Sequence, residues 1–147
     1  MTHGQGGPIT VLAFDYGLRR IGVAVGNTFT STAEPLITLG ARAGKPDWDA
    51  ITRCVGEWGP GVMVVGVPSN MDGTPGPLTA GAQDFAAELS ARFGVRAELV
   101  DERLSSREAE QALKSKRQSG ELGRRVRRAE VDREAACVLL RQWLAGK

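Results

Sequence analysis

Histidine is almost missing from this sequence. Its single copy, His3, lies among the first few residues, which argues against Ser-His or Cys-His catalysis and against zinc held by histidines. The two cysteines, Cys54 and Cys137, are far apart and have neither metal-site spacing nor the pattern of a secreted disulfide scaffold. We expect both to be reduced and buried. Any catalytic chemistry must therefore come from carboxylates.

Long apolar runs are also missing. No run approaches the length of a membrane span, and the opening residues, "MTHGQGGP", lack the apolar core of a signal peptide. We expect residues 1–8 to be a disordered tail and the protein to be cytoplasmic, with no membrane partner. The 147 residues, 41% of them hydrophobic and 24% charged, are typical of one globular domain, which we place at residues 9–147.

Charge of one sign is concentrated in a single segment, although the net charge is only +2. Between Lys114 and Arg128, one acid, Glu121, stands against seven bases: Lys114, Lys116, Arg117, Arg124, Arg125, Arg127 and Arg128. This excess is typical of a surface that contacts a polyanion. A solvated helix face followed by a charged loop would explain it equally well.

Apolar runs and helical spacing alternate along the chain. Strands are expected at residues 9–14, 20–27, 35–39, 62–67 and 95–100, and helices at 46–58, 77–93, 105–117 and across the last segment. Gly94 should cap the second helix, and Ser105 with Glu108 forms a capping box for the third. The three tryptophans fall on apolar helix faces and should be core residues. The order predicts an α/β fold whose central mixed sheet has five strands, opens with a hairpin and is flanked by helices.

Three carboxylates occupy positions where a site could form. Asp15 follows the first strand, Glu102 follows the last, and Asp132 lies early in the final helix beside the small residues Ala135 and Ala136. Sites in α/β sheets form beyond the carboxyl ends of strands. If the three acids converge there, their mutual repulsion favours a divalent cation, and all-oxygen ligands favour Mg²⁺ or Mn²⁺. Alternatively, each acid serves only its own turn or helix end.

Four stretches, "FDYGLRRIGVAVG", "VGVPSNMDGT", "VDERLSS" and "AEVDREAACVLL", together resemble the YqgF (RuvX) family of ribonuclease H-like nucleases. The resemblance runs in order from about Ile9 to Leu144. It implies a ribonuclease H-like fold and a metal-dependent nuclease whose catalytic, metal-binding acids are Asp15, Glu102 and Asp132. It further implies action on RNA, processing the 5′ end of 16S ribosomal RNA, with a ribosome or pre-ribosomal particle as a partner.

The resemblance leaves other functions open. Related resolvases of the RuvC type carry a second acid one turn after the helix aspartate, where this chain has Ala135; Asp101 or Glu134 could substitute for it. A Holliday-junction resolvase would act on branched DNA as a dimer, and we expect a monomer or a weak homodimer. An actin-type or sugar-kinase ATPase would need two such domains. A non-catalytic RNA- or ribosome-binding module would use only the basic segment.

Two arginines beside the first acid complete the candidate site. Arg19 and Arg20 are placed to contact a phosphate or to balance the acidic cluster, and we favour Arg19 as the one nearer the substrate. The resemblance favours nucleic-acid binding for the basic segment, whose glycines suggest a loop that orders on the ligand. The "NMDGT" stretch could contact substrate or simply form a turn.

Overall fold

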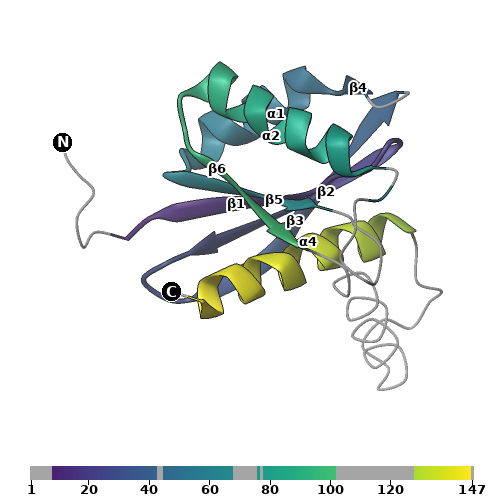
Figure 1. The fold of residues 1–147 in the computed structure, drawn as a ribbon. Coiled ribbons are helices and arrows are strands. Elements are labelled where there is room, and N and C mark those ends of the chain that lie inside the picture. The colour runs from purple at the N-terminus through teal and green to yellow at the C-terminus, as the bar shows by residue number, and fades with distance from the viewer. Residues whose placement is uncertain (1–7, 43–44, 68–75, 77, 102–127, 147) are drawn as a thin grey trace, which may run out of the picture.

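The computed structural model describes residues 8–42, 45–67, 76, 78–101 and 128–146. Within these residues a six-stranded sheet has the order β4-β3-β2-β1-β5-β6 (Figure 1). The predicted helix at 105–117, the "NMDGT" stretch and most of the basic segment lie outside the described residues. None of the described helices is long and apolar enough to cross a membrane.

The sheet opens with the expected hairpin. Strand β1 (Thr10–Asp15) pairs antiparallel with β2 (Arg20–Asn27), and β1 pairs parallel with β5 (Val62–Val67), which pairs parallel with β6 (Ala97–Asp101). The continuous apolar runs produced the most central strands because both faces of those strands are covered. In β1, residues Val11 to Phe14 are fully buried. The carboxyl ends of β1, β5 and β6 consequently lie at one edge of the sheet.

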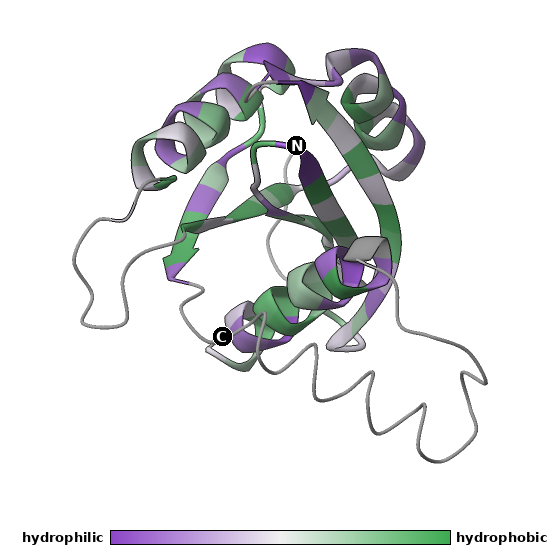
Figure 2. Ribbon diagram, turned by 90° about the vertical axis from the view of Figure 1, so that its right-hand side faces the viewer, coloured by the Kyte–Doolittle hydropathy of each residue, from purple (hydrophilic) through white to green (hydrophobic). Residues whose placement is uncertain are grey.

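Helices cover both faces (Figures 1 and 2). Helices α1 (Trp48–Trp58) and α2 (Thr79–Phe93) pack on one face, where Phe14, Ile51, Phe85 and Leu89 belong to one buried cluster. Helix α4 (Arg128–Ala145) crosses the other face over β1, β2 and β3. Gly94 ends α2 in the left-handed conformation at φ 66°, as predicted.

The edge beyond β2 differs from the prediction. Strand β3 (Thr32–Arg42) has 11 residues rather than the five expected, and a two-residue strand β4 (Lys45–Pro46) makes the sheet six-stranded. The signal was weak because β3 is mostly exposed, so its pairing with β2 depends on backbone hydrogen bonds and not on an apolar run. Pro46 lies in β4 rather than in the first turn of α1, which begins after Asp47; the Asp47 Oδ1 accepts a hydrogen bond from the Ala50 amide at 3.2 Å.

The cysteines and tryptophans test the predicted core. Cys54 and Cys137 are not joined in a disulfide, and both are buried, in clusters on opposite faces of the sheet, as expected for reduced thiols. Burial raises the pKa of the Cys54 thiol, with a smaller contribution from Glu57. Trp48 and Trp143 pack against the core, but Trp58 is 38% exposed, so its assignment to the core was wrong. Trp58 ends α1 and is followed by the Gly59 cap, where little packs over it.

Candidate active site

Asp15 is the last residue of β1, and a glycine lies beside it on each neighbouring strand. In register, Asp15 pairs with Gly22 of β2 and with Gly66 of β5. Side chains alternate between the faces of a strand, and Val11 and Ala13 belong to the cluster under α4. Asp15 therefore faces α4. Neither register partner of Asp15 has a side chain, so these strands place no side-chain atoms directly beside it.

Asp132 reaches the same place from α4. A Cβ built on Gly22 would lie only 1.9 Å from the carbonyl oxygen of Asp132, so the helix backbone rests directly on β2 at this glycine. Ala135 and Ala136, both fully buried, allow the same close approach on the helix side. Since Gly22 is the register partner of Asp15, this packing brings Asp132 to the strand pair that carries Asp15. The two acids thus share one face and one end of the sheet.

Arg20 links the hairpin to α4. Its Nε donates to the Asp132 Oδ2 at 2.6 Å, across 112 residues of sequence, and both side chains are partly buried. A charge-assisted hydrogen bond of this length holds the carboxylate in one orientation and balances its charge. Charge balance was one of the two roles considered for the arginines. The sequence reasoning did not identify this particular contact, and no local sequence signal specifies it.

Tyr16 anchors the end of β1 on the opposite face. It is buried and packs on Phe85 of α2, with ring centroids 5.5 Å apart. A Cβ built on Gly81 of α2 would lie 2.9 Å from the Tyr16 hydroxyl oxygen, so α2 lies close to the ring. The residue after Asp15 is thereby held by the aromatic core while Asp15 itself faces α4. The acid is positioned from both faces of the sheet.

The other predicted site residues are placed less completely. Glu102 lies outside the described residues, as do the bases from Lys114 to Arg127; Arg128 begins α4. The Arg19 side chain is exposed, and its carbonyl accepts a hydrogen bond from the Ala41 amide at 2.9 Å. In the part of the chain that the structure describes, no three acids, cysteines or histidines gather into a metal-binding cluster. The role of Glu102 and the preference for Arg19 stay predictions.

Asp101 and Glu134, the two residues suggested as substitutes for the acid that is missing at Ala135, do not face the site. Asp101 alternates with Val100, which packs under α4, so Asp101 projects from the opposite face. Glu134 is buried and lies 3.6 Å from Arg141, Oε2 to Nη1, on α4. Glu134 lies about 200° around the helix from Asp132, so its side chain points away from the site.

Solved structures with this arrangement of elements are resolvases. The RuvC protein of T. thermophilus in complex with a Holliday junction substrate superposes with a TM-score of 0.53 at 15% identity, over 94% of each chain. The Fowlpox virus resolvase in complex with junction DNA gives 0.58 at 10% identity, over 94% of this chain and 98% of that one. At such low identity the likeness concerns the fold. The fold is thus ribonuclease H-like, as predicted, with one strand more than expected.

Sequence relatives narrow the class to a family. A relative in Pasteurella multocida (strain Pm70) is 44% identical over 140 residues, 95% of this chain and 96% of the relative. One in Legionella pneumophila (strain Paris) is 46% identical over 133 residues, 90% and 93%. Both bear the name "Putative pre-16S rRNA nuclease". The family described as "RuvX: Holliday junction resolvase" matches residues 9–146, and the chain belongs to that family.

Proposed function

We propose that this protein is a divalent-metal-dependent nuclease that hydrolyses phosphodiester bonds in the 5′ region of precursor 16S ribosomal RNA. The observation that carries the proposal is the contact of α4 with Gly22, which brings Asp132 to the strand pair bearing Asp15. The names of the relatives support the RNA substrate. Such a protein would work in the cytoplasm on the ribosome or a pre-ribosomal particle, as a monomer or weak homodimer.

The residues at this end of the sheet fit a hard divalent cation. Asp15 and Asp132 supply carboxylate oxygens, with Glu102 as the proposed third ligand, and Gly22 lets the α4 backbone bring Asp132 to the strand pair that carries Asp15. Mg²⁺ or Mn²⁺ held there would supply a water of lowered pKa and would stabilise the leaving oxygen. Acids on one face that would otherwise repel each other are the donor set that such an ion requires.

The basic residues have separate tasks in this proposal. Arg20 holds the Asp132 carboxylate in one orientation through the 2.6 Å contact. Arg19, exposed at the hairpin turn, binds a phosphate next to the scissile bond. The bases of the segment from Lys114 to Arg128 bind the backbone at further phosphates, which positions the substrate without reading its sequence.

Cleavage of branched DNA is the second candidate. The resolvase structures and the description of the family favour it. The fully buried Ala135 argues against it, because resolvases of the RuvC type place an acid at that position of the helix. Resolution of a junction also needs two active sites that face opposite strands. A solution measurement that finds only monomer in the presence of junction DNA would count heavily against this candidate.

The decisive experiment compares the parent with an Asp15→Asn variant. Each is incubated with a precursor 16S fragment and with a four-way DNA junction, first with Mg²⁺ or Mn²⁺ and then with EDTA. We expect the parent alone to cleave the RNA, and EDTA to abolish cleavage. Cleavage by the variant at the parental rate would overturn the acid-cluster site. RNA binding without cleavage by either protein would instead indicate a binding module.

A further inference from the structure

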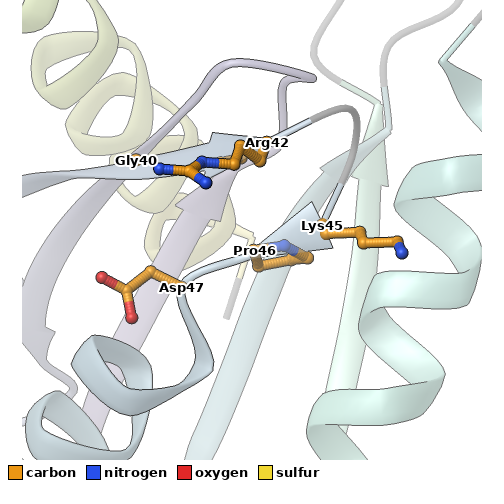
Figure 3. Close-up of a pocket in the computed structure, with 6 residues that line it drawn as sticks. Gly40, Arg42, Lys45, Pro46 and Asp47 are labelled. Carbon is orange, nitrogen blue, oxygen red and sulfur yellow. The ribbon is translucent and has the colours of Figure 1, made fainter.

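A groove beside the candidate active site has no role in the function proposed above. It has a volume of about 440 Å³ and lies at the hairpin of β3 and β4 (Figure 3). Its walls come from Gly40, Ala41 and Arg42 on one side and from Lys45, Pro46 and Asp47 on the other. The sequence reasoning missed this site because Arg42 and Lys45 stand alone between neutral residues and form no charge run.

The described lining of the groove holds two cations, Arg42 and Lys45, and one acid, Asp47, which leaves an excess of one positive charge. Arg42 and Lys45 are both exposed, and neither forms an ion pair within the described parts of the chain. The acid in its lining, Asp47, already accepts the hydrogen bond that caps α1. In Figure 3 the Arg42 guanidinium lies back along β3 above Gly40, whereas Lys45 extends from the other side of the hairpin. Gly40 forms the floor of the groove, and this floor is unobstructed, since no atom lies within 4 Å of a Cβ built there.

The groove opens at the same edge of the sheet as Asp15. Strand β3 runs antiparallel to β2, so β3 ends where β1 ends. Asp15 is the register partner of Gly22, and Gly22 is the register partner of Thr38, so Asp15 and Thr38 are two strand spacings, or about 10 Å, apart. Arg42 lies four residues beyond Thr38 on the same strand, a further distance of about 13 Å along β3. The Cα atoms of Asp15 and Arg42 are therefore about 16 Å apart.

Arg20 lies between the two places, and Arg19 precedes it at the hairpin turn. Arg20 pairs in register with Gly40, and the Arg19 carbonyl accepts a hydrogen bond from the Ala41 amide. Since Leu39 is buried under α1 and α2, Gly40 and Arg42 project from the other face, the one that carries Asp15 and Asp132. Cations thus continue outward from the acidic end of β1 along one face.

We propose that the β3–β4 groove binds the phosphodiester backbone of the substrate about 16 Å from the scissile bond. The inference rests on the proposed nuclease function and extends it. Exposed cations around an open floor suit a phosphate backbone, and the described residues of the lining include no aromatic side chain on which a base could stack. The groove thereby sets a minimum substrate length and does not select a sequence.

The test measures binding without cleavage. The full chain is titrated in EDTA with labelled single-stranded RNA of four and of sixteen nucleotides, across a series of salt concentrations. The variants are Arg42→Gln, Lys45→Gln and the two combined. Arg53→Gln is the matched control, since Arg53 is an exposed cation on α1 that also has no ion pair among the described residues. Gly40→Glu adds a carboxylate at a position with room for a Cβ.

We expect the double variant to bind the sixteen-nucleotide RNA about tenfold more weakly at 0.1 M salt, with a salt slope shallower by about 1.4. Gly40→Glu should also weaken binding of the long RNA, whereas Arg53→Gln should not. The four-nucleotide RNA should bind all variants equally. Equal affinities for the long RNA in the double variant and in Arg53→Gln would overturn the groove, even if Asp15→Asn has lost cleavage. Parental cleavage by Asp15→Asn would instead overturn the proposed function and leave the binding result to stand.

Discussion

The two faces of the sheet are packed in opposite ways. Under α1 and α2 lie large side chains, among them Phe14, Tyr16 and Phe85, with ring centroids of Phe14 and Phe85 5.6 Å apart in an edge-to-face contact. Under α4 the strands present mainly glycine, alanine and valine, and the helix packs on them with Ala136 and with leucines such as Leu139 and Leu140. The aromatic face supplies buried apolar area, whereas the small-residue face lets a helix backbone come close enough to deliver a carboxylate.

The difference teaches that stability and site geometry are assigned to different faces. A large side chain on the aromatic face gains free energy through the area it buries. On the α4 face an atom added at Gly22 would move Asp132 away from β1 and β2, because the helix rests on this glycine. Substitutions on the two faces should therefore separate loss of stability from loss of activity.

Phe85→Ala should give the largest loss of stability. Phe85 is buried between Phe14, Tyr16 and Trp48, and removal of its ring leaves a cavity worth about 3–5 kcal/mol in the free energy of unfolding. Urea denaturation measures this loss. In the protein that remains folded at low temperature, RNA cleavage should fall less than in Gly22→Ala, because Phe85 supports Asp15 only through Tyr16 and the packing of α4 on Gly22 is unchanged. A loss of cleavage as large as that in Gly22→Ala would contradict the assignment of stability and site geometry to different faces.

Gly22→Ala should cost less stability and more activity. The added Cβ must displace α4, which costs about 1–3 kcal/mol, and it shifts Asp132 relative to Asp15. We expect RNA cleavage to fall by at least about tenfold at temperatures where circular dichroism shows a folded protein, since small displacements of catalytic groups have large kinetic effects. Gly56→Ala, where a Cβ also meets nothing within 4 Å, is the matched control. Parental activity in Gly22→Ala would contradict the proposed geometry.

Arg20→Gln should affect activity with little change in stability. The ion pair with Asp132 is more than a third exposed on the arginine side, so its loss should lower the free energy of unfolding by less than about 1 kcal/mol. Cleavage should fall because Asp132 is no longer held in one orientation. Isothermal titration with Mn²⁺ provides a second readout, in which the variant should bind differently from the parent. If Arg20→Gln cleaves RNA and binds Mn²⁺ as the parent does, Arg20 has no role at the site.

Gly56→Ala should have the smallest effect and the opposite sign. Gly56 lies inside α1, is exposed, and has no atom within 4 Å of the position of a Cβ. Alanine there should raise the free energy of unfolding by about 0.5–1 kcal/mol, because the unfolded chain loses conformational freedom. Thermal denaturation measures the gain, and cleavage should not change. A destabilised variant would mean that this part of α1 is packed more tightly than its exposure indicates.

Prediction from sequence succeeded where one local property decides the outcome. The apolar runs specified β1, β2 and β5, and Gly94 marked the end of α2, because burial on both faces and a left-handed cap each leave a direct trace in the residues. It failed for the full length of β3 and for β4. Their residues are mostly exposed, and their pairing depends on the neighbouring strand.

The same distinction between local properties and contacts of distant segments applies to the candidate site. The sequence by itself selected Asp15 and Asp132, from the end of an apolar run and from a helix with small neighbours, and its four motifs indicated the family that the matched residues 9–146 confirm. Only the tertiary structure decided that α4 rests on Gly22, that Arg20 binds Asp132 across 112 residues, and that Arg42 lies on the same face as both acids. The physical reason is that local composition encodes which residues are buried or capped, whereas contacts between distant segments arise only when the helix and the strands pack together.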